Sequence, residues 1–70
     1  MEKITIETEY ITLSALLKHA GAVSSGGVAK QLILDGLVKV NGETVFARGC
    51  KVRPGDIVAV DHLKMMVVSS

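Results

Sequence analysis

Cysteine and tryptophan are almost absent from this sequence. Its 70 residues contain one cysteine and no tryptophan. A single cysteine allows no disulfide within the chain and no cysteine-based zinc site, so packing alone must hold the fold. That suits a reducing compartment, and we expect a cytoplasmic protein. A chain this short is expected to form one domain over residues 1–70, with a thin core and little room for a deep catalytic pocket.

Aromatic residues and long apolar runs are also scarce. No apolar stretch approaches the roughly 20 residues that span a bilayer, and residues 1–5 lack the pattern of a signal peptide, so we expect no membrane partner. Tyr10 and Phe46 are the only tyrosine and phenylalanine. This weighs against RNA-binding domains that stack several bases on an aromatic sheet. With 49% hydrophobic residues, the chain is too apolar to be disordered.

The charge is nearly balanced overall but uneven along the chain. The net charge is +1, yet residues 30–53 carry five cations and two acidic residues, a net charge of +3. If these cations share one face, they can hold a phosphate backbone, with arginine binding bidentately and lysine as a point charge. The alternative is an ordinary solvated surface. The five cations are Lys30, Lys39, Arg48, Lys51 and Arg53.

Local patterns predict a strand followed by two helices. Residues 3–7 alternate polar and apolar, as in a half-buried strand. The first helix is expected to begin after the N-cap Thr12 and to end at Gly21, and the second to begin after Ser25 and to end at Gly36. The apolar spacing of a buried helix face recurs in both helices. Its members are Leu13, Leu16, Leu17, Ala20, Ala29, Leu32 and Ile33.

The second half of the chain predicts a sheet. Strands are expected at residues 37–40, 43–46, 57–60 and 65–68, with a two-residue hairpin at Asn41 and Gly42. Residues 47–53 are predicted to be a loop, followed by a type II turn at Pro54 and Gly55. Asp56 is expected to form hydrogen bonds within that turn. The predicted fold class is therefore α+β, with two short helices packed on a small antiparallel meander and a leading strand.

The start of the second helix is the most informative segment for chemistry. Gly26 and Gly27 leave backbone N–H groups uncovered at a helix N-terminus, which favours an anion such as phosphate. The alternative is that the two glycines only permit a tight turn. Lys39 is expected on the strand face opposite Val38 and Val40. If the second helix packs beside this strand, Lys30 and Lys39 border one groove.

Catalysis finds little support in this sequence. His19 is expected near a helix C-terminus, where a cation is favoured, and His62 in a turn between strands. Neither has an evident nucleophile or a metal-spaced partner, and no role is assigned to Cys50. We therefore expect no enzymatic activity, no metal, no cofactor and no small-molecule substrate.

In their order along the chain, residues 12–60 resemble the S-four RNA-binding domain, or alpha-L motif. The matching features are the leucines of the first helix, Gly21 at its end, Ser25 and the apolar face of the second helix, the sequence around Asn41 and Gly42, and the turn at Pro54–Asp56. The short leading strand and the Arg48–Gly49 pair look most like the small stand-alone YaaA/YbcJ-like members. The resemblance covers about 50 of the 70 residues.

The resemblance implies a domain that binds structured RNA, often ribosomal, and does not catalyse. Many members carry one or two arginines after the serine, where this chain has glycines, and its first helix also lacks their Arg-Leu-Asp opening. A role in ribosome assembly or translation follows by analogy, with ribosomal or assembly proteins as further partners. The alternatives are a protein-interaction module with a weakened RNA site, and a small enzyme. The implied RNA-facing residues are Ser25, Gly26, Gly27, Lys30, Gln31, Lys39, Asn41, Arg48, Lys51 and Arg53.

Overall fold

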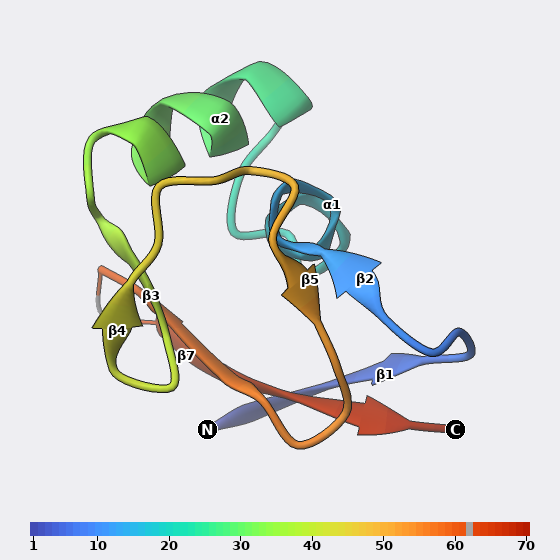
Figure 1. The fold of residues 1–70 in the computed structure, drawn as a ribbon. Coiled ribbons are helices and arrows are strands. Elements are labelled where there is room, and N and C mark those ends of the chain that lie inside the picture. The colour runs from blue at the N-terminus through green and yellow to red at the C-terminus, as the bar shows by residue number, and fades with distance from the viewer. Residues whose placement is uncertain (62) are drawn as a thin grey trace.

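The computed structural model describes residues 1–61 and 63–70, so the prediction for His62 lies outside the described residues. Two helices stand over a twisted sheet, and a smaller pair of strands lies beside the first helix (Figure 1). In chain order the elements are β1 (Glu2–Ile6), β2 (Ile11–Thr12), α1 (Leu13–His19), α2 (Gly26–Leu34), β3 (Val38–Val40), β4 (Glu43–Thr44), β5 (Lys51–Val52), β6 (Ile57–Val60) and β7 (Leu63–Ser69).

The main sheet has five strands in the order β1-β7-β6-β3-β4. The pairs β4–β3, β3–β6 and β6–β7 are antiparallel. In contrast, β1 runs parallel to β7, with Glu2 opposite Met65 and Ile6 opposite Ser69. The α+β class is therefore confirmed, and the sheet is mixed. A parallel pair needs a long crossover connection, and here nearly the whole chain lies between its two strands.

The strands after the helices do not form a simple meander. β3 pairs with both β4 and β6, because the chain leaves the main sheet after β4. Within the predicted loop 47–53 it forms β5, which pairs with β2. A two-residue strand is too short to show an alternating pattern, so the sequence prediction of a loop was wrong there. The return strand is also shorter than predicted, and Phe46 beyond it is 59% exposed.

The helix ends agree with the predicted boundaries, but α1 is capped in an unexpected way. Gly21 and Gly36 adopt positive φ angles of 74° and 75° after the two helices. Ser25 caps α2, since its Oγ accepts a hydrogen bond from the amide of Val28 at 3.3 Å. Thr12 precedes α1 without a side-chain cap. The predicted hydroxyl cap is thus wrong for α1.

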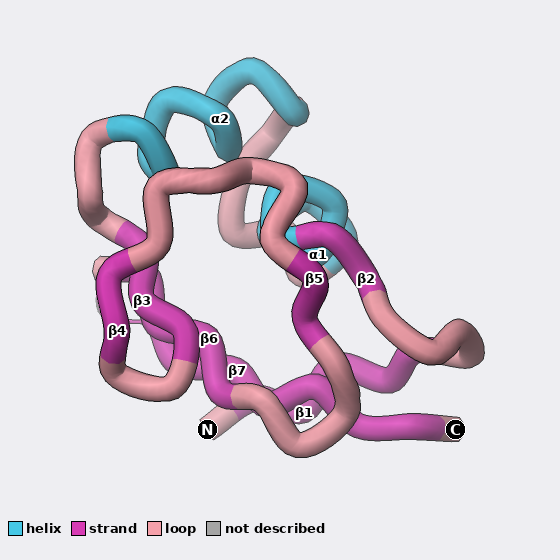
Figure 2. The backbone as a smooth tube through the Cα atoms, viewed as in Figure 1, coloured by secondary structure: helices cyan, strands magenta, loops and turns pink. Residues whose placement is uncertain are grey.

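Carbonyl groups from a distant loop cap α1 instead. The amides of Leu13 and Ser14 donate to the carbonyls of Cys50 and Arg48, at 2.9 and 3.2 Å. These N–H groups have no partner within the helix, so the loop satisfies donors that would otherwise need water or a hydroxyl. The loop that joins β4 to β5 crosses from the hairpin to the start of α1 (Figure 2).

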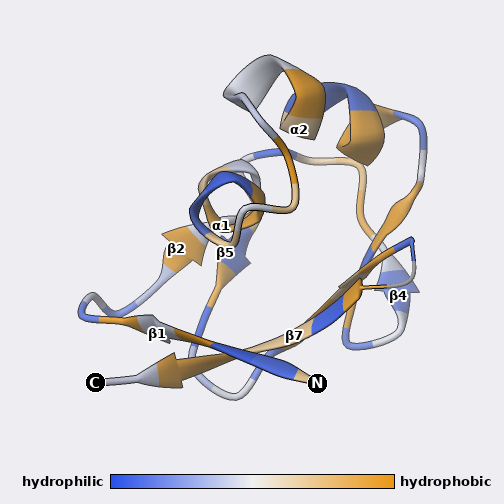
Figure 3. Ribbon diagram, turned by 180° about the vertical axis from the view of Figure 1, so that it is seen from behind, coloured by the Kyte–Doolittle hydropathy of each residue, from blue (hydrophilic) through white to orange (hydrophobic). Residues whose placement is uncertain are grey.

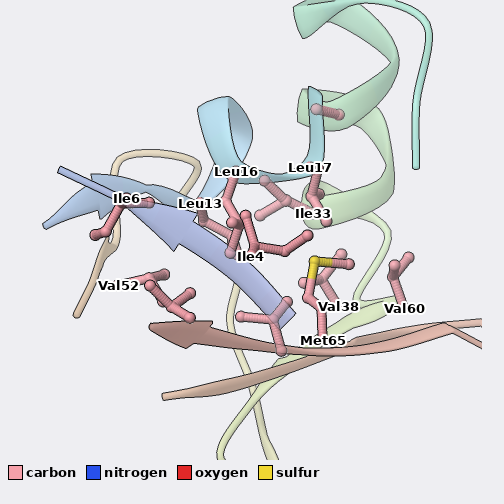
Figure 4. Close-up of a cluster of buried hydrophobic side chains, with 13 residues drawn as sticks. Ile4, Ile6, Leu13, Leu16, Leu17, Ile33, Val38, Val52, Val60 and Met65 are labelled. Atoms are coloured by element: carbon pink, nitrogen blue, oxygen red, sulfur yellow. The ribbon is translucent and has the colours of Figure 1, made fainter. Parts of the chain in front are cut away.

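One hydrophobic cluster joins both helices to one face of the main sheet. Leu13, Leu16 and Leu17 of α1 and Ile33 of α2 are fully buried and point toward the strands (Figure 4). The sheet contributes alternate residues to this cluster, such as Val38 and Met65, as period-two alternation requires. We call this covered side the inner face and the opposite side the outer face.

We predict that Leu17→Ala destabilises the fold strongly, by about 2–5 kcal/mol, because it leaves a cavity in a thin core. Leu17 is fully buried, whereas Leu34 on α2 is 52% exposed. The matched control Leu34→Ala is expected to change the free energy of unfolding by no more than about 0.5 kcal/mol. Urea denaturation followed by circular dichroism measures both. Equal losses would contradict this description of the core.

Candidate nucleic-acid interface

The first turn of α2 presents open backbone to solvent. A Cβ added to Gly26 would meet no atom within 4 Å, and one added to Gly27 would meet only the Ser25 Oγ at 3.9 Å. Both glycines lie within the helix, and neither has a positive φ. Neither packing nor a tight turn therefore requires glycine here, and the tight-turn alternative is wrong. What the glycines provide is uncovered amide groups at the positive end of a helix.

Lys30 and Gln31 follow on the exposed side of α2. Both side chains are exposed, as predicted from their place off the apolar stripe. Gln31 donates from Nε2 to Asp35 Oδ1 at 2.9 Å, which is an i, i+4 pair on the helix surface. Lys30 lies one turn beyond the open amides and adds a full positive charge to that region.

The segment that caps α1 also carries cations. Arg48 is held by its own carbonyl, which accepts from the amide of Ser14. The Nζ of Lys51 lies 4.9 Å from the centroid of the Tyr10 ring, within the range of a cation–π interaction. Val52 is fully buried, whereas Lys51 and Arg53 on either side of it are exposed.

Asn41 is tied into the fold by its side-chain amide. Its Nδ2 donates to Asp56 Oδ1 at 3.1 Å, and its Oδ1 accepts from the amide of Ile57 at 2.9 Å. Asp56 Oδ2 accepts from the amide of Arg53 at 2.9 Å, which confirms the predicted bond within that turn. Two turns far apart in sequence are thereby joined, and Arg53 is anchored beside them through its backbone.

Lys39 lies on a different surface from Lys30. Val38 is fully buried on the inner face, so Lys39 projects from the outer face, as the alternation predicted. Lys39 lines a hollow with Leu32 of α2. Lys30 lies about 160° around the helix from Leu32, since successive residues are about 100° apart. The prediction that Lys30 and Lys39 border one groove is therefore wrong.

The remaining predicted positions fall into two groups, one on α2 and one in the segment that caps α1. The first turn of α2 continues into Lys30 and Gln31, and the segment from Arg48 to Arg53 packs through Val52 into the core beneath the helices. The first group is Ser25, Gly26, Gly27, Lys30 and Gln31, and the second is Arg48, Lys51 and Arg53 in the segment that caps α1. We call the two groups together the helix-side surface, and that they form one continuous surface stays a prediction. RNA contact by each of these residues stays a prediction.

The comparisons with known proteins identify the family. Residues 4–68 match the family described as the S4 domain. The chain belongs to the S4 domain family. This confirms the resemblance found in the sequence. A solved structure, that of the 30S ribosomal protein S4e from Thermoplasma acidophilum, shares the fold with a TM-score of 0.70, covering 83% of this chain and 31% of that one at 24% identity.

Curated proteins include small and large relatives of this S4 domain. The probable ribosome maturation protein RlbA of Bacillus subtilis is 43% identical over 58 residues, which cover 83% of this chain and 82% of that protein. An uncharacterized RNA pseudouridine synthase of Aquifex aeolicus is 50% identical over 52 residues, covering 73% of this chain. The ribosomal large subunit pseudouridine synthase B of Bacillus subtilis is 43% identical over 53 residues, covering 76% of this chain. The chain spans only 20% and 21% of the lengths of these two enzymes.

Sequence reasoning missed two features of this surface. The contact between Tyr10 and Lys51 and the capping of α1 by the loop both join residues about 35 to 40 positions apart. No local sequence pattern predicts contacts between residues so far apart in the chain. Within residues 1–61 and 63–70, no group of three or more metal-ligating side chains is present, and no helix is long and apolar enough to cross a membrane.

We predict that Asn41 acts on stability rather than on RNA affinity. Asn41→Gly removes the two side-chain hydrogen bonds but tolerates the φ of 52°, and is expected to lower the free energy of unfolding by about 1–2 kcal/mol. Asn41→Ala adds strain at positive φ and is expected to cost about 1 kcal/mol more. RNA affinity, measured where both variants are folded, is expected to stay within twofold. A large loss of affinity in stable Asn41→Gly would instead show direct contact.

Proposed function

We propose that this S4 domain, residues 1–70, binds structured RNA and in particular ribosomal RNA through phosphate contacts on the helix-side surface. The observation that carries the proposal is that α2, which has an open N-terminus, and the segment that caps α1 together carry four exposed cations. They are Lys30, Arg48, Lys51 and Arg53. The names of the relatives support the ribosomal assignment, since they describe ribosome maturation and modification of the large ribosomal subunit.

In this proposal the protein recognises the phosphate backbone and the shape of the RNA. Arginine can hold a phosphate with two parallel hydrogen bonds, whereas lysine contributes a point charge. Tyr10 is 40% exposed and already has Lys51 near its ring, and Phe46 lies beyond β4 in the loop. Two separate aromatic residues do not make a platform for successive bases. Contacts to phosphates therefore supply most of the affinity in this proposal, and the fold selects RNA by shape.

The proposal is binding without catalysis. The similarity to pseudouridine synthases is confined to about a fifth of each enzyme. We place the protein in ribosome assembly or translation in the cytoplasm, because the small relative that matches this chain over most of both lengths is named for ribosome maturation. Ribosomal or assembly proteins are further partners in this setting.

A protein-interaction module is the second candidate, and exposed apolar side chains near the end of α2 favour it. Leu34, Leu37 and Phe46 are each more than half exposed. Phe46 lies against Gly36, since a Cβ added there would be 3.2 Å from its ring. A purified RNA tests the two candidates directly, because a module that only binds proteins has no affinity for it.

We predict a steep salt dependence of RNA binding. With four phosphate contacts, the logarithm of the association constant should fall against the logarithm of the salt concentration with a slope of roughly −3 to −4. Filter binding of a labelled RNA hairpin at several salt concentrations measures this slope. Lys30→Gln combined with Arg48→Gln should make it shallower by roughly 2, for all hairpin sequences alike. A flat response of the unaltered protein would reject RNA binding and favour the protein-interaction module.

We also predict that an arginine at the start of α2 strengthens RNA binding. Gly26→Arg places a cation where the structure has open space and where many S4 domains carry arginine. The expected gain is roughly fivefold in affinity, equivalent to about 1 kcal/mol. Gly26→Gln is the matched control, because it changes helix propensity similarly without adding charge. Equal affinities of the two variants would contradict a phosphate site at this position.

A further inference from the structure

The outer face of the main sheet is not covered by either helix, and it carries three lysines. Lys3, Lys39 and Lys64 come from β1, β3 and β7 and are all exposed. In each strand the neighbouring residues Ile4, Val38 and Met65 are buried on the inner face. Alternation therefore directs the three lysines to the outer face. Seen from behind, hydrophilic segments interrupt β1 and β7 (Figure 3).

The register brings the three lysines close together. Lys39 lies opposite Ala59, and Ala59 lies opposite Lys64, so two strand spacings of about 4.8 Å separate the lysine backbones by about 10 Å. Lys3 is opposite Met66, one strand across and two residues along from Lys64, which corresponds to about 8 Å. Lys39, Ala59 and Lys64 also line the same hollow.

Charges are sorted by face in these strands. The outward positions of β1, β3, β6 and β7 carry lysines but no acidic residue. Glu2 and Glu43 belong to the inner face, because they lie opposite Met65 and Val40 in the register. Asp61, in the turn after β6, lines the same hollow as Lys39 and Lys64. Neighbouring like charges repel one another on a sheet, so three lysines at outward strand positions that hold no acidic residue suit an anionic partner.

Protection of exposed sheet edges does not explain this pattern. Lysine on an edge strand discourages pairing with another chain, and β1 is such an edge. Lys39 and Lys64 lie on β3 and β7, which have a hydrogen-bonded neighbour on each side. Two of the three lysines therefore protect no edge.

We propose that the outer face is a second phosphate-binding surface, which holds an RNA backbone through Lys3, Lys39 and Lys64. The proposal rests on the proposed RNA-binding function and extends it. The helix-side surface binds one RNA segment, and the outer face binds another on the opposite side of the sheet. The outward residues of these four strands include no aromatic ring, so contact is with phosphates and not with bases. The domain thereby bridges two RNA segments.

The bridge is tested with two copies of one RNA hairpin, one immobilised and one fluorescent. The unaltered protein is expected to retain the fluorescent hairpin on the immobilised one. The triple variant Lys3→Gln, Lys39→Gln, Lys64→Gln is expected to bind the immobilised hairpin but to lose retention of the fluorescent one at least tenfold. Its salt slope for binding a single hairpin should stay at roughly −3 to −4, because the helix-side surface is unaltered.

A matched variant removes the same number of charges from the helix-side surface. The triple variant Lys30→Gln, Arg48→Gln, Lys51→Gln is also expected to lose bridging. It should still bind one hairpin through the outer face, and this binding should weaken as the salt concentration rises. Thermal unfolding followed by circular dichroism confirms that both triple variants are folded. Full retention of the fluorescent hairpin by the outer-face variant overturns this proposal alone. Absence of hairpin binding by the unaltered protein overturns the proposed function as well.

Discussion

Burial of the leucine stripe of α1 against the inner face of the sheet is the interaction on which the whole structure depends. Leu13, Leu16 and Leu17 are fully buried, and they meet side chains from both ends of the chain, including Ile4 and Val67. The described residues include no buried polar side chain and no disulfide. Apolar packing is therefore the main stabilising term, and small domains have little of it to lose.

The same helix connects stability to the candidate site. The amides at the start of α1 are satisfied by carbonyls of Arg48 and Cys50, so the loop that carries Arg48 is part of the helix cap. The β2–β5 pair then continues this attachment to Lys51 and Val52. Hydrogen bonds thus fix the backbone of an otherwise irregular segment that carries cations, which reduces the ordering cost of binding a ligand there.

Strand alternation and helix periodicity decide where the lysines of the S4 domain project. Lysines of the strands project from the outer face because every second residue is needed for the core. Lys30 lies on the exposed side of α2, and Arg48, Lys51 and Arg53 lie in the segment that caps α1. The two basic surfaces proposed above therefore belong to a chain that is nearly neutral overall. The net charge of the chain does not by itself show how the lysines and arginines are distributed.

Much of the fold was determined by the sequence itself, because the signals for it are local. Ser25 as a cap, glycines at the helix ends, the Asn41–Gly42 turn and the direction of Lys39 all depend on a few neighbouring residues, and they hold in the structure. Tertiary structure decided the rest. The parallel pairing of β1 with β7, the β2–β5 pair and the capping of α1 join distant segments, and no local spacing encodes them. Which cations share a surface was decided in the same way, because that depends on how the helices are rotated against the sheet and not on the order of residues.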